Sequence, residues 1–183
     1  MIIEERYLQT FDEIHNIVTE VRDNANEDEF LDWVESVLIL GYKDGMDSTA
    51  EMLDMAIDTS DLPLDKLDKA LSLVIDGKTY RDRIHEYWEG GSNDEIERVV
   101  ATEYHRMFNE GGYTEAKELG ATMKEWITVG DDKVRETHSY IEGMQVPIDA
   151  RFYTFDNDSA LAPGGFSNAS NNVNCRCVVK YIR

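Results

Sequence analysis

The chain has 183 residues, 42% of them hydrophobic, and a formal net charge of −20. This length and apolar fraction suffice for one globular domain or two small ones with a real core. No apolar run approaches the ~20 residues that cross a bilayer, and the first residues lack the basic start and apolar stretch of a secretory signal. We therefore expect a protein of the cytosol that does not contact membranes.

The acidic residues are concentrated in the first two thirds of the chain. Residues 1–120 carry 11 Lys and Arg against 30 Asp and Glu, whereas residues 121–183 carry 7 against 8. Such a surface repels phosphate groups, which argues against direct DNA binding by the whole molecule. It favours, as binding partners, a basic or mixed protein surface or divalent cations. The alternative is that the acidic side chains only keep helices solvated.

The first 91 residues predict a series of amphipathic helices, because their apolar residues recur at steps of three and four. The apolar stripes run, in chain order, from Tyr7 to Val21, Phe30 to Leu40, Leu64 to Val74 and Tyr80 to Trp88. Gly41 and Gly45 are expected to loosen the end of the second helix. The sequence Ser48-Thr49-Ala50-Glu51 fits a capping box, in which a hydroxyl and a carboxylate satisfy free amides at a helix start, and predicts a new short helix there.

A second capping box, Ser92-Asn93-Asp94-Glu95, opens the best-defined helix of the chain. This helix is expected to reach a loop at Gly111-Gly112, or to resume beyond it as far as Gly120. Glu103 falls on or beside its apolar face, where a charge is costly unless it is paired. The alternative is that the stripe drifts and leaves Glu103 at the solvated margin.

After Gly120 the pattern changes to short strand-like segments, at residues 124–129, 145–148, 151–155 and 175–182, with one or two helical turns within residues 134–141. Residues 156–174 are rich in Asn and Ser and include Pro163-Gly164-Gly165, which predicts a long loop. The predicted fold class is α+β. A mostly helical acidic region, residues 1–91, precedes a small mixed α/β domain with a short antiparallel sheet, residues 92–183.

Both cysteines of the chain lie near its end, in Asn174-Cys175-Arg176-Cys177. Alternate side chains of an extended segment share a face, so Cys175 and Cys177 can converge on one object. A disulfide is disfavoured because Cys-x-Cys closes a very small ring, whereas a zinc ion accepts the pair. His138 is the candidate third ligand. The alternative is that both thiols are reduced and pack as small apolar groups.

Two aspartates are candidates for completing this zinc site. Asp131 or Asp132 could complete the four ligands, with Asp131 the one we select, or either could instead orient His138 by a hydrogen bond. A structural zinc ion here would fix the final strand across the long loop, whose closure is entropically costly. An enzyme is a weaker alternative. His138, Asp131, Asp132 and Glu103 could form a metal-assisted hydrolase. Alternatively, Cys175 and His138 could act as a nucleophile and its base. However, no recognisable catalytic signature is present.

Several short motifs together resemble the C-terminal domain of the phage Mu protein F-like minor head proteins. They are Thr102-Glu103, Asn109-Glu110-Gly111, Lys124-Glu125-Trp126, Asp131 or Asp132, Val134-Arg135, His138, Gly143, Val146-Pro147 and Asn174-Cys175-Arg176-Cys177. The resemblance covers residues 92–183. Beside the metal candidates it marks Glu103, Asn109, Trp126, Asp132, Arg135 and Arg176. The family usually has a basic residue where this chain has Ala101, so the natural partner of Glu103 is either missing or replaced, with Arg106 and Arg135 as the candidate replacements.

The resemblance implies a non-catalytic head morphogenesis protein of a tailed bacteriophage or prophage, acting in procapsid assembly near the portal. Its expected partners are portal and capsid or scaffold proteins, and its expected location is the virion head or procapsid, or the bacterial host cytoplasm during assembly. Some relatives are fused to toxin enzymes, but no extra domain is expected here. The competing class is an acidic decoy that occupies the nucleic-acid-binding groove of a basic partner.

Overall fold

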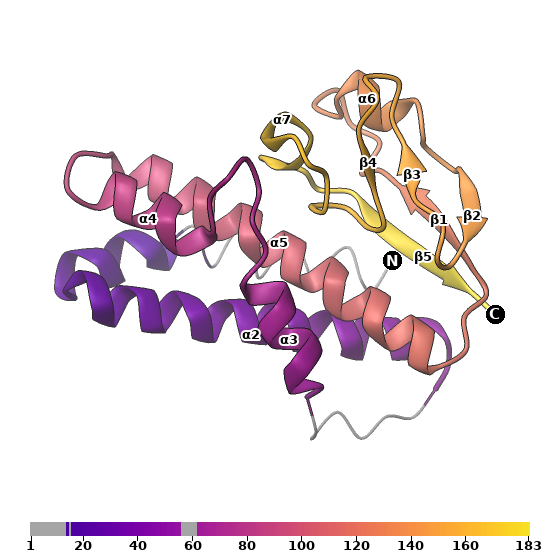
Figure 1. Cartoon of the computed structure of the whole chain (residues 1–183), viewed down its shortest axis with the longest axis horizontal. Coiled ribbons are helices and arrows are strands. Elements are labelled where there is room, and N and C mark those ends of the chain that lie inside the picture. Colours follow the sequence, from indigo (N-terminus) through magenta and orange to yellow (C-terminus); the bar gives the residue numbers. More distant parts are fainter. Residues whose placement is uncertain (1–13, 15, 56–61) are drawn as a thin grey trace.

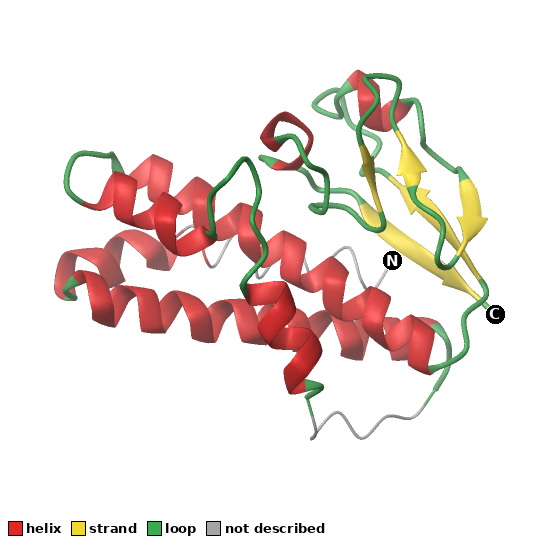
Figure 2. Cartoon of the chain, viewed as in Figure 1, coloured by secondary structure: helices red, strands yellow, loops and turns green. Residues whose placement is uncertain are grey.

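The computed structural model describes residue 14 and residues 16–55 and 62–183. The elements, in chain order, are α2 (Glu27–Met52), α3 (Leu64–Leu71), α4 (Tyr80–Trp88), α5 (Asn93–Glu118), β1 (Met123–Ile127), α6 (Glu136–Ser139), β2 (Gln145–Pro147), β3 (Phe152–Tyr153), β4 (Ser159–Ala160), α7 (Ala169–Asn172) and β5 (Val178–Ile182). Residues 16–24 are also helical. Helices precede a small sheet region that lies against α5 (Figures 1 and 2). The predicted α+β class is therefore confirmed.

Three helices begin with the side-chain caps that satisfy their free amide groups. Asn26 and Glu29 form a capping box at α2, and Ser92 and Glu95 form the predicted one at α5. The helix predicted to start at Ser48 is wrong, because Ser48-Thr49-Ala50-Glu51 lies within the last turns of α2. The apolar residues Tyr7 and Phe11 of the first predicted stripe lie outside the described residues.

The glycines that were expected to end helices instead lie inside them, at the crossing of the two longest helices. Gly45 of α2 faces α5, and Gly111 of α5 faces α2. A Cβ atom on Gly45 would overlap the carbonyl oxygen of Phe108, and one on Gly111 would overlap that of Tyr42. Glycine is used here because the backbones of α2 and α5 approach too closely for any side chain. The predicted loop at Gly111-Gly112 is therefore wrong, and α5 continues to Glu118.

The main sheet is antiparallel, with strand order β2-β1-β5, and β3 pairs with β4 in a separate hairpin. In the register of β1 and β5, Lys124 pairs with Tyr181 and Trp126 with Val179. All four of these side chains are buried, so one face of the sheet is the inner face. The final strand begins at Val178. Cys175 and Cys177 therefore precede β5, whereas the predicted strand, residues 175–182, included them.

Two apolar clusters form the interior. The first is built from the helices, and the second from the sheet, its loops and the end of α5. Helix α5 contributes Ile96, Tyr104 and Phe108 to the first cluster and Ala116 to the second. The domain boundary after residue 91 stays a prediction. Among the helices of residues 16–55 and 62–183, none is both long and apolar enough to cross a membrane.

Candidate metal centre

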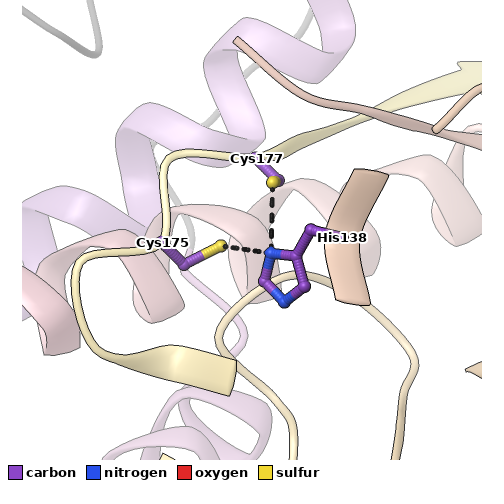
Figure 3. Close-up of side chains that lie close together, drawn as sticks. All are labelled: His138, Cys175 and Cys177. Carbon is purple, nitrogen blue, oxygen red and sulfur yellow. Dashed lines mark hydrogen bonds between the residues drawn. The ribbon is translucent and has the colours of Figure 1, made fainter. Parts of the chain in front are cut away.

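Three soft donor atoms meet where α6 packs against the segment that enters β5. His138 lies on α6, and its Nδ1 atom is 3.6 Å from Sγ of Cys175 and 3.4 Å from Sγ of Cys177 (Figure 3). All three residues are buried, and their candidate ligand atoms lie within 4.8 Å of one another. The predicted meeting of His138 with both cysteines is what the structure shows.

The two distances from Nδ1 to the sulfurs match the N···S edges of a zinc tetrahedron. With a Zn–N bond of about 2.05 Å and Zn–S bonds of about 2.3 Å, tetrahedral angles give an N···S edge of about 3.6 Å. The two observed N···S distances are 3.6 and 3.4 Å. One imidazole nitrogen has a single lone pair, so two sulfurs directed at the same nitrogen are better suited to a shared cation than to two hydrogen bonds.

The pKa values of the two thiols are shifted in opposite directions. Burial raises the pKa of Cys175, but hydrogen bonds from Cys177, His105 and His138 outweigh it and hold that pKa well below its usual value. The pKa of Cys177 is raised, first by its hydrogen bond to the Cys175 sulfur and then by burial. The pair thus favours one thiolate and one thiol, and a divalent cation would displace the remaining proton.

An aromatic shell fixes the imidazole ring. The ring of His138 lies edge-on to Trp126, with centroids 5.2 Å apart, and stacks on Phe166 at 5.3 Å. Trp126 is fully buried and also contacts Phe152 edge-on. The Nε2 atom of His138 is buried and has no hydrogen-bond partner among the described residues. The imidazole is therefore oriented by packing.

Neither aspartate takes the part predicted for it in this site. Both oxygens of Asp131 accept hydrogen bonds from the Arg176 guanidinium at 2.8 Å, and this pairing lowers the pKa of Asp131. Asp131 is therefore an ion-pair partner of Arg176 in this structure and does not belong to the cluster of candidate ligand atoms. Asp132 is exposed and makes no hydrogen bond to His138, whose Nδ1 faces the sulfurs. A bidentate guanidinium captures a nearby carboxylate more readily than a neutral ring does.

Arg135 joins the two chain segments that carry the ligands. Its two terminal nitrogens donate to the carbonyl oxygens of Asn171 and Val173, at 2.8 and 2.5 Å. These carbonyls lie just before Cys175, and Arg135 lies at the start of α6, just before His138. Together with the ion pair of Asp131 and Arg176, this contact fixes the distance between the histidine and the cysteines.

The loop between these segments is more ordered than its composition predicted, because it is built around one carboxylate. Asp158 is buried and accepts hydrogen bonds from the backbone amides of Ser159, Ser167 and Asn168 and from the side chains of Ser167 and Asn171. Burial raises its pKa, but these hydrogen bonds more than offset that effect and lower the pKa to about 2. The loop includes β4 and α7, neither of which was predicted.

His105 is the residue near the site that the sequence did not identify. It is fully buried on α5, and its hydrogen bond to Cys175 contributes to the lowered pKa of that thiol. Asn109, one turn later, donates to the backbone carbonyl of His105 at 3.0 Å and contacts its ring. The sequence did contain a signal: His105 and Asn109 are polar residues four positions apart inside an apolar helix, a spacing that indicates a buried polar contact.

Glu103 is buried and paired, which resolves the two alternatives left by its position. Its side chain is 3% exposed and accepts hydrogen bonds from Arg106, at 2.8 Å, and from Arg83. Arg106 is the partner predicted for it, Arg83 was not foreseen, and Arg135 is engaged elsewhere. The carboxylate thus ties α4 to α5 inside the helical layer.

Fold and site together define a small α+β module in which a helical layer supports a sheet fastened by a His-and-two-Cys cluster. The chain belongs to the family of the phage Mu protein F like protein, whose sequence pattern it matches over residues 65–180. The predicted resemblance is confirmed. The family suggests a phage head morphogenesis protein located in the virion or procapsid, and its generally structural character is compatible with a protein that is not an enzyme.

A curated relative is the NAD(+)–arginine ADP-ribosyltransferase EFV of Enterococcus faecalis (strain ATCC 700802 / V583), which is 36% identical over 111 residues. The match covers 57% of this chain and 22% of that protein. The chain thus corresponds to about a fifth of the relative, and the transferase activity in the name is that of the relative as a whole. No solved structure is significantly similar to this chain.

Proposed function

We propose that this protein is a non-catalytic minor head protein of a tailed bacteriophage or prophage that acts in procapsid assembly near the portal. The observation that carries the proposal is membership of the phage Mu protein F like family over residues 65–180. The structural roles of the motif residues support the proposal. Glu103 and Arg135 make side-chain hydrogen bonds that stabilise the fold, and Trp126 is fully buried. Its partners would be the portal and the capsid or scaffold proteins.

The test is whether the protein enters heads. We expect mass spectrometry to find it in purified procapsids or virions in few copies, and deletion of its gene to lower the yield of DNA-filled heads. A variant truncated before Asn174, which lacks the cysteines, should fail to restore that yield. Absence of the protein from both procapsids and virions, with normal head production in the deletion strain, would rule the proposal out.

We further propose that His138, Cys175 and Cys177 bind a zinc ion that fastens the final strand to the rest of the module. The convergence of both sulfurs on Nδ1 supports this assignment. Elemental analysis of purified protein should give about one zinc per chain, and chelation should lower the unfolding temperature. Cys177→Ser should lose the metal, while Asp132→Asn, at an exposed carboxylate, should keep it. Metal well below one equivalent, with stability indifferent to chelator, would exclude zinc.

A second candidate function is favoured by the charge distribution. The net charge of −19 over residues 1–120 suits a decoy that occupies the basic groove of a nucleic-acid-binding protein. Competition with DNA for such a partner, weakening steeply as salt is added, would support it. Copurification with portal or scaffold protein at physiological salt would instead favour the head protein. Incubation with NAD⁺ and an arginine-containing acceptor should give no labelled product, and labelling would revive an enzymatic function.

A further inference from the structure

The three donors leave one position of a zinc tetrahedron to be filled, and the structure has a small cavity beside them. The cavity has a volume of about 10 Å³ and is bordered by all three candidate ligands, His138, Cys175 and Cys177. This is close to the minimum space that holds one water molecule, roughly 10–15 Å³. The exposed residue Lys133 also lines it, so the cavity reaches the surface.

The residues around this cavity offer no further metal ligand. Apart from the three donors, its lining is formed by Val129, Lys133, Val134, Arg135, Asn174 and Arg176. Within the part of the chain that the structure describes, no carboxylate, and no imidazole other than that of His138, lines the cavity. The carboxylate of Asp131 is bound to Arg176, and His105 approaches Cys175 without lining this cavity.

The charge of the lining favours an anion. Three residues with cationic side chains, Lys133, Arg135 and Arg176, are among those that line the cavity. Arg135 donates to backbone carbonyls, which carry no net charge, whereas Arg176 is paired with the carboxylate of Asp131. A cation held by two thiolates and one imidazole would carry no net charge with its ligands. The surrounding positive groups would then attract a small anion to a position that is still open.

We propose that the metal ion bound by His138, Cys175 and Cys177 keeps an exchangeable fourth ligand, a water or hydroxide that a small monodentate anion can replace. This inference rests on the proposed metal site but goes beyond it. A purely structural zinc site is closed by four protein ligands, whereas three protein ligands and one solvent position leave the metal accessible. The narrow cavity admits a single donor atom and excludes chelating ligands.

The experiment uses the full chain with Co²⁺ in place of zinc, because the visible absorption of Co²⁺ reports its ligands. Sodium azide is titrated at constant ionic strength, with perchlorate as the balancing salt. We expect a saturable change in the visible bands. Lys133→Gln should weaken azide binding roughly threefold, the effect of removing one unit charge about 6 Å away in water. X-ray absorption of the zinc form should show two sulfurs, one imidazole and one oxygen.

Two outcomes would overturn the inference, and they differ in whether they also overturn the proposed metal site. Bands that do not respond to azide, together with two imidazoles in the X-ray absorption, would mean that His105 moves in to close the site, and the structural zinc proposal would survive. Failure to bind either Co²⁺ or Zn²⁺ would remove the metal site itself. Neither result would bear on the proposed place of the protein in the phage head.

Discussion

Replacing Gly45 with alanine tests the close contact between α2 and α5. The new Cβ would overlap the carbonyl oxygen of Phe108 and lie 2.8 Å from its carbonyl carbon and 3.0 Å from the backbone nitrogen of Gly112. All three atoms belong to the backbone of α5, so no side chain can rotate away. The two helices would have to separate, and the contacts that they share in the first apolar cluster would loosen.

Two opposing terms set the size of the effect. Alanine is favoured over glycine in a helix interior by about 1 kcal/mol. Overpacking of a core costs about 1–3 kcal/mol, and we take the upper end because both sides of the contact are main chain. The net expectation is a loss of about 2 kcal/mol. For a chain of this size that is a decrease in unfolding temperature of about 4–8 °C.

The measurement is thermal unfolding followed by circular dichroism, supported by urea titration at 25 °C. Gly90→Ala is the matched control, because a Cβ there meets no atom within 4 Å. That variant should be neutral, or more stable by up to about 1 kcal/mol. If Gly45→Ala unfolded at or above the wild-type temperature, the inference that α2 and α5 require glycine at their crossing would be wrong.

Three further predictions concern buried charges. Glu103→Gln leaves two arginines without their carboxylate, and urea titration should show a loss of about 3 kcal/mol or more in the free energy of unfolding. The control is Glu86→Gln, at an exposed pair with Lys78, which should change that free energy by less than about 1 kcal/mol. The pKa of Asp158 is about 2 against about 4 unfolded, so its stabilisation is complete above pH 4 and is lost as the pH falls toward 2. Asp158→Asn should remove this loss of stability between pH 4 and pH 2. If the variant lost stability over that range as the wild type does, the role given to Asp158 would be wrong. Burial lowers the pKa of Lys124 to about 8, so the unfolded chain binds more protons between pH 8 and about 10.4. Stability should rise across that interval, and Lys124→Met should abolish the rise.

The sequence predicted the helices well where local chemistry decides, and poorly where a distant segment does. The capping box at Ser92 and the apolar period behind it define the start of α5 without reference to any other segment. Glycine has two uses in helical proteins, ending a helix and admitting a neighbouring backbone. The choice at Gly45 and Gly111 depends on which helix lies opposite, and the spacing of apolar residues within one helix does not contain that information.

The convergence of His138 with the two cysteines was predictable for a different reason. Cys175 and Cys177 are two residues apart, so their convergence follows from local geometry, and few other residues of the chain could be the third soft ligand. The assignment of Asp131 depended instead on competition between two possible partners. Arg176, adjacent to both cysteines, offers two parallel donors. Only the three-dimensional arrangement shows that the guanidinium is closer to the carboxylate than the metal site is.

Helix α5 belongs to both apolar clusters and also reaches the candidate metal site. Helix α5 packs against α2 through its glycines, and its buried His105 contacts Cys175 beside the proposed metal. A second link joins the backbone amide of Tyr181 in β5 to the sulfur of Met52 at the end of α2. A partner protein that binds the acidic helices would therefore act on the frame that holds the ligands. Because a shift of α5 changes the surroundings of Cys175, binding at the helices and metal affinity should be coupled in both directions.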